Sequence, residues 1–89
     1  GTGGVAKRAL VGLRWFDSDA GWRLIRQRAT DRSDWEMRQT AAEQLGHKDE
    51  PANRDLLLKL LQTDGDSDVL AAAFKAARRL FGVESLDPH

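Results

Sequence analysis

The feature that most constrains this chain is an internal repeat with a period of 32 residues. Its matched apolar positions are Val5, Met37 and Val69; Ala9, Ala41 and Ala73; Leu10, Ala42 and Phe74; and Leu13, Leu45 and Ala77. Within each copy, the four positions stand 0, 4, 5 and 8 residues after the first. These positions lie on one face of an α-helix, whose period is 3.6 residues. A repeat of this length therefore predicts similar helical units that stack and bury a shared core.

Start and stop signals divide the chain into five expected helices, at about residues 4–15, 18–30, 34–45, 50–62 and 67–81. Ser33 and Glu36 have the spacing of a capping box, which starts a helix. Further helix starts are expected at Asp17, Asp49 and Asp66, because a carboxylate there accepts from free backbone N–H groups. Gly46 and Gly82 are expected to end helices in a left-handed conformation.

The fold class that follows is all-α: a right-handed α-solenoid segment of about two and a half helical hairpins. Short loops make neighbouring helices antiparallel, and one hairpin of this length cannot bury its own apolar face. We expect residues 1–4 to be a flexible segment or cloning remnant, residues 5–82 to form the domain, and residues 83–89 to be a tail. The repeats would span about 5–36, 37–68 and 69–82.

The core of this solenoid is expected to combine small and large side chains. Alanines would let the helices approach closely, while the bulk would come from the second and fourth helices. Trp15, Phe16, Leu80 and Phe81 are expected to pack in the core or at its edge. The other expected core residues are Ala9, Ala41, Ala42, Ala71, Ala72, Ala73, Ala76, Ala77, Trp22, Ile25, Ala29, Leu56, Leu57, Leu60 and Leu61.

Composition excludes several classes of function. The chain has no cysteine, which rules out disulfides, thiolate metal sites and cysteine nucleophiles. No apolar run is long enough to span a membrane and no secretory leader is visible, so we expect a cytoplasmic protein. The 14 basic and 14 acidic residues cancel overall. Residues 1–30, however, hold six basic and two acidic side chains, a net charge of +4.

The central repeat resembles a known family. The run from Met37 to Gly46 has an apolar residue followed by arginine, then a small pair, then Leu-Gly, and it is similar to the first helix of a HEAT-like repeat of the short, phycobilisome-lyase type. The resemblance covers nearly the whole chain and specifies architecture rather than chemistry. It implies a scaffold that holds another macromolecule on its concave face, and we expect a segment of a larger protein.

Two enzymatic relatives within that resemblance do not fit these residues. Deoxyhypusine hydroxylase-like HEAT proteins bind iron through His-Glu pairs, whereas Lys48 follows His47 in this chain. DNA-glycosylase-like HEAT proteins use a long basic groove with tryptophans, for which this chain is too short. No second ligand stands at metal spacing from His47, and no serine or threonine has a visible base partner. We therefore expect no catalytic residues, no metal and no cofactor.

The expected binding residues lie on the second and fourth helices, which line the inner surface of HEAT-like solenoids. They form two stripes at helical spacing: Arg23, Arg26 and Gln27, and then Asp55, Leu58 and Lys59. The guanidinium groups suit carboxylates or phosphates, and an exposed leucine among charges suits a protein contact. An ordinary solvated helix face has the same composition.

Two functions are open at this point. The first is a non-catalytic protein–protein interaction scaffold that binds a protein or peptide through these two stripes. The alternative is a HEAT-like segment that contacts nucleic acid, similar in this to the DNA-glycosylase-like proteins, in which the basic residues of the first third neutralise phosphates.

Overall fold

The computed structural model describes residues 2–82 and contains five helices there. Each boundary falls within two residues of its predicted place. Residues 2–4, expected to be flexible, belong to the first helix, while the expected tail at 83–89 lies outside the described residues. The helices are α1 (Thr2–Phe16), α2 (Asp19–Ala29), α3 (Trp35–Leu45), α4 (Pro51–Thr63) and α5 (Ser67–Phe81).

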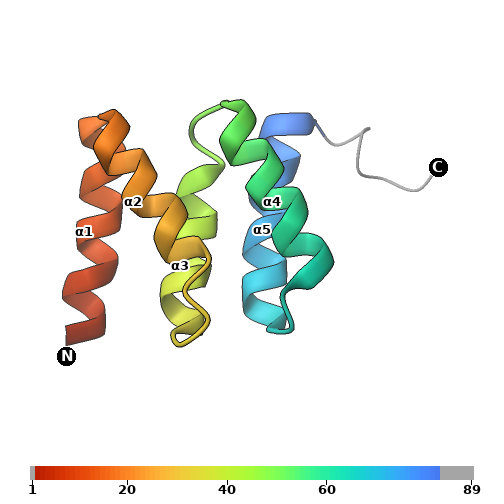
Figure 1. The fold of residues 1–89 in the computed structure, drawn as a ribbon, viewed down its shortest axis with the longest axis horizontal. Coiled ribbons are helices and arrows are strands. Elements are labelled where there is room, and N and C mark those ends of the chain that lie inside the picture. Colours follow the sequence, from red (N-terminus) through yellow and green to blue (C-terminus); the bar gives the residue numbers. More distant parts are fainter. Residues whose placement is uncertain (1, 83–89) are drawn as a thin grey trace.

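The helices form two layers. Helices α1, α3 and α5 lie side by side and run in the same direction, while α2 and α4 run the opposite way in a second layer (Figure 1). The resulting body is elongated, with extents of 42, 27 and 15 Å along its principal axes. This is the all-α, solenoid-like arrangement that the 32-residue repeat predicts.

Each helix of the second layer covers mainly the helix that follows it. Helix α2 packs more extensively on α3 than on α1, and α4 packs more extensively on α5 than on α3. Met37 and Val69, in the first turns of α3 and α5, are accordingly buried. Val5 has the equivalent position in α1 but is 68% exposed, because no described helix precedes α1. The first position of the repeat is therefore buried in α3 and α5 but exposed in α1.

The core is largely the predicted one. Trp22, Ile25 and Ala29 of α2 are buried, as are Leu57 and Leu60 of α4. The alanines of α3 and α5 fill the contact between those helices, where small side chains allow a close approach. The buried alanines of these two helices are Ala41, Ala42, Ala72, Ala73, Ala76 and Ala77.

Part of the predicted core is wrong. Trp15 and Phe16 are exposed at the end of α1, since no later helix folds back over that end. Ala9 and Ala71 are exposed, whereas Leu56 and Leu61 are partly buried and pack against the core. Leu80 and Phe81 do pack against the core edge.

Helix capping departs from the prediction at α3. Asp34, not Ser33, caps this helix, and its carboxylate accepts from the backbone N–H of Met37 at 3.1 Å. The Ser33 hydroxyl instead donates to Asp31. Glu36 pairs with Lys7 of α1 at 2.7 Å, so the capping box is wrong and its glutamate joins two helices.

Two of the three predicted aspartate caps are also wrong. Ser18 caps α2, while Asp17 takes a left-handed φ of 53° and accepts from the buried indole N–H of Trp22 at 2.7 Å. Asp49 pairs with Arg54 and leaves the cap position of α4 to Glu50. Asp66 does cap α5, as predicted.

Gly46 is needed for space rather than for a left-handed turn. Its φ is −71°, an ordinary helical value, so the predicted left-handed cap is wrong there. A Cβ at this position would lie 2.8 Å from both Cα and Cβ of Ala76. The close approach of the α3 end to α5 therefore requires glycine. Gly82 does have a positive φ, of 86°.

A buried ion pair joins the turns between the hairpins. The Arg38 guanidinium in α3 donates to the Asp64 carboxylate at 2.9 Å and to the backbone carbonyl of Asp31 at 2.9 Å. The Asp64 side chain is fully buried and that of Arg38 is 6% exposed. Asp64 also accepts from the backbone N–H of Asp66, so the pair connects α3 with the loop before it and with the loop between α4 and α5.

We predict that Asp64→Asn lowers the free energy of unfolding by about 3 kcal/mol, because it leaves the buried Arg38 charge without its counter-charge. Urea denaturation at pH 7 measures this change. Asp55→Asn is the matched control: this aspartate is exposed, and its loss should change stability by no more than about 0.5 kcal/mol. Equal effects of the two variants would contradict the role of the pair.

The difference in stability between the wild type and Asp64→Asn is predicted to depend on pH. Burial by itself raises the pKa of Asp64, but the Asp66 backbone N–H and the Arg38 guanidinium outweigh it and hold the pKa below its ordinary value of 3.8. The stabilisation is therefore complete above pH 3.8 and is lost as the pH falls through the lower pKa of the folded state. The difference in the free energy of unfolding between the wild type and Asp64→Asn should therefore become smaller as the pH falls below 3.8.

Gly46→Ala should destabilise the fold by about 1–3 kcal/mol, because the added methyl group meets the backbone of α5. Gly12→Ala is the control, since a Cβ there meets no atom within 4 Å on the exposed side of α1. That substitution should stabilise by about 0.5–1 kcal/mol through helix propensity. Thermal unfolding of both variants tests the contrast, and a neutral Gly46→Ala would refute the steric explanation.

Candidate functional site

The six predicted binding residues lie on the layer formed by α2 and α4, and we call this face the α2–α4 surface. Arg23 and Gln27 are exposed on α2, while Asp55, Leu58 and Lys59 are exposed on α4. Leu58 is 39% exposed, about as much as Phe74 on the other layer. Its neighbours on the helix face, Asp55 and Lys59, form no ion pair within the described chain.

Arg26 differs from the other five. Its guanidinium donates to the Asn53 side chain at 3.0 Å and to Glu50 at 3.3 Å, and it is about three-quarters buried. Asn53 is fully buried and donates in turn to the backbone carbonyl of Lys48. Arg26 therefore joins α2 to the start of α4 and positions the two helices rather than standing free for a partner.

A hollow of about 350 Å³ lies on this layer, between the end of α2 and helix α4. Lys59 is the one predicted binding residue that lines it. Sequence reasoning missed the hollow because Leu56 was assigned to the core, whereas its side chain is only partly buried here. The lining residues are Thr30, Arg32, Leu56, Lys59, Leu60 and Thr63.

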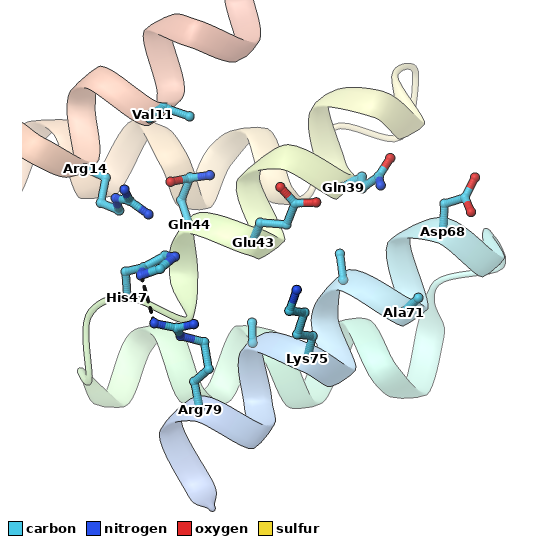
Figure 2. Close-up of a pocket in the computed structure, with 12 residues that line it drawn as sticks. Val11, Arg14, Gln39, Glu43, Gln44, His47, Asp68, Ala71, Lys75 and Arg79 are labelled. Carbon is cyan, nitrogen blue, oxygen red and sulfur yellow. Dashed lines mark hydrogen bonds between the residues drawn. The ribbon is translucent and has the colours of Figure 1, made fainter.

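The other layer holds a larger depression, which runs across α1, α3 and α5 and which we call the α1–α3–α5 groove (Figure 2). Its volume is about 500 Å³. Val11 and Arg14 line it from α1, and Gln44 from α3, while Ala72 and Ala76 of α5 leave space because their side chains are short. None of the six predicted residues lines this groove. The sequence contained a signal for it, the run of small residues in α5, but that run indicated only close packing.

The groove has two electrostatically different ends. Arg14, His47 and Arg79 stand at one end, near the C-termini of the three parallel helices. Glu43 and Lys75 lie nearer the middle, and Asp68 lies at the other end (Figure 2). Arg79 lies 3.4 Å from the His47 ring nitrogen Nδ1. Burial, followed by the charges of Arg14 and Arg79, lowers the pKa of His47 below its ordinary value. This shift favours the neutral ring, so the positive charge at this end comes chiefly from the arginines.

The described residues contain no cluster of three His, Cys, Asp or Glu side chains that could hold a metal ion. None of the helices between residues 2 and 82 has the length and apolar character needed to cross a bilayer.

The basic residues of the first third do not act as one surface. Lys7 is paired with Glu36 and Arg26 with Glu50, so two of the six positive charges are compensated. Arg14 faces the groove of the other layer, away from the exposed Arg23 of α2. This dispersal gives a phosphate backbone no continuous positive stripe to follow.

Comparison with known proteins agrees with this architecture. The family model described as HEAT repeats matches residues 4–88. No curated protein and no solved structure gave a significant match. HEAT repeats are stacked helical hairpins, and the two-layered packing of α1 to α5 is of that kind. Since the match covers nearly the whole length, the chain belongs to the HEAT-repeat family.

Proposed function

We propose that this chain is a non-catalytic protein-interaction module that binds a protein or peptide partner through the α2–α4 surface. HEAT repeats in general act as scaffolds for protein–protein interaction. The observation that carries the choice of surface is the exposure of Leu58 between two charged side chains without ion-pair partners. An apolar centre with a polar rim is the usual composition of a protein-binding patch.

Mixed charge favours a protein over a nucleic acid as the partner. Asp55 and Lys59 flank Leu58 with opposite signs, and an exposed carboxylate beside the contact repels phosphates. Arg23 and Gln27 on α2 add a guanidinium and an amide, which pair with carboxylates and with peptide groups. Arg26 supports the surface indirectly, because its bonds to Glu50 and Asn53 hold α2 and α4 at a defined spacing.

This surface is presented on a rigid body. Both helices pack on the layer behind them through fully buried side chains, such as Ile25 and Leu57. A partner that docks there encounters side chains already held in place, so binding costs little ordering of the scaffold. The hollow beside Lys59 extends the contact area at the end of α2.

The test is to isolate a partner by affinity capture with the full chain and then titrate the purified partner against variants. Leu58→Ala should weaken its binding about tenfold, as expected for a residue at the centre of an interface. Phe74→Ala is the matched control, because Phe74 is a similarly exposed apolar residue on the other layer. Both variants should keep the wild-type melting temperature to within a few degrees.

Loss of binding in Phe74→Ala, with Leu58→Ala unaffected, would contradict the assignment of the α2–α4 surface. The nucleic-acid alternative has a separate measurement, titration of a labelled oligonucleotide at low salt. Affinity that falls steeply with rising salt concentration would favour that alternative, because counterion release produces this dependence.

A further inference from the structure

The α1–α3–α5 groove contains a buried polar group that lacks a partner. Gln44 is only 5% exposed, and its side-chain Nε2 donates to the Thr40 carbonyl at 3.3 Å. Its Oε1 accepts no hydrogen bond from the described chain. Exchanging the two amide atoms would set Oε1 against the Thr40 carbonyl oxygen, so this orientation is the favoured one. A buried acceptor without a donor destabilises the fold, which makes its position in a groove informative.

Three hydrogen-bond donors gather at the same end of the groove (Figure 2). Arg14 forms no ion pair with the described residues and stacks over the Trp15 ring, while Arg79 donates to His47 and likewise forms no ion pair there. A guanidinium can only donate, so Nδ1 of His47 is the acceptor in its contact with Arg79, and the proton of the neutral ring is then on Nε2, which remains a donor. Two guanidinium groups and an imidazole N–H thus face the groove without a carboxylate partner.

These groups together specify the chemistry of a ligand. Guanidinium groups bind a carboxylate through paired, charge-assisted hydrogen bonds. The Gln44 oxygen requires an N–H donor, which a simple carboxylate ion does not have. A peptide segment carries both groups, and the short side chains of Ala72 and Ala76 give its backbone room along α5. Asp68 repels a carboxylate from the other end of the groove, so the acidic residue is favoured at the end that holds Arg14 and Arg79. Lys75 balances the charge of Glu43 near the middle.

We propose that the α1–α3–α5 groove binds an extended peptide segment that contains an acidic residue. The side-chain carboxylate of that residue lies between Arg14 and Arg79, and a backbone N–H of the peptide donates to Oε1 of Gln44. This site lies on the layer opposite the α2–α4 surface, so it is a second interaction site of the module. Offsetting the helix dipoles explains basic residues near three helix C-termini, but it does not explain the unpaired Gln44 oxygen.

The proposal is tested with the isotopically labelled full chain and a blocked pentapeptide, a central glutamate flanked by alanines, at millimolar concentration. Nuclear magnetic resonance should show shifts at the Gln44 side-chain amide, the His47 ring and the Arg79 guanidinium. Arg79→Gln should raise the dissociation constant about tenfold. Arg28→Gln, which removes the same charge from an exposed arginine of α2, should change it less than twofold.

Gln44→Met separates a binding role from a structural one, because methionine has a similar shape but no unpaired oxygen. We expect the melting temperature to rise by about 4 °C and the peptide affinity to fall about tenfold. A stabilised variant with unchanged affinity would overturn the contact between Gln44 and the peptide.

Two further results would overturn the site itself. One is an equal loss of affinity in Arg28→Gln and Arg79→Gln, which would indicate attraction to overall charge. The other is a set of shifts with acetate ion that matches the peptide in position and affinity, which would indicate an anion site only. The α2–α4 surface takes no part in this titration. A negative result would therefore overturn the groove site and leave the proposed function to be tested separately.

Discussion

The buried pair of Arg38 and Asp64 is the interaction on which the arrangement of repeats depends. A charge in the interior is tolerated only when its counter-charge and further hydrogen bonds surround it. Here the guanidinium also donates to the Asp31 carbonyl, and the carboxylate also accepts from the Asp66 backbone N–H. One ion pair thus holds the loop before α3 and the loop before α5 in fixed relation, and with them the register of successive hairpins.

Close packing of α3 on α5 is the second constraint, and it shapes one face of the molecule. Alanines and Gly46 bring the two helices together until a single added methyl group would collide with the backbone of α5. The same small side chains leave a groove on the outer side of these helices. The α2–α4 layer has a smaller hollow and exposes Leu58 together with charged residues. The two faces therefore suit different kinds of contact.

Much of the fold could be predicted from the amino-acid sequence alone, and the predictions that were wrong have identifiable causes. Helix positions were predictable because a 3.6-residue apolar period and short loops are local properties. The caps of α2 and α3 were not, since adjacent residues such as Ser33 and Asp34 compete for one role and tertiary contacts decide between them. Glu36 reads as half of a capping box until Lys7, 29 residues away, proves to be its partner.

The candidate sites show the same division. Exposure of Leu58 followed from its place off the buried face of its helix. The burial of Arg26 could not be predicted, because Glu50 and Asn53 approach it only when α4 lies beside α2. The α1–α3–α5 groove could not be predicted from the sequence, because it is made by three helices spaced about one repeat apart.

The amino-acid sequence alone determined the repeat period, the number of helices, the all-α class and most of the core, because each depends on patterns within one or two helical turns. Tertiary structure decided which charges are paired, why Val5 is exposed while Met37 is buried, and where the surface is hollowed. Those properties depend on distances between residues about 25 to 30 positions apart, as for Arg38 and Asp64. Only packing of the helices fixes such distances.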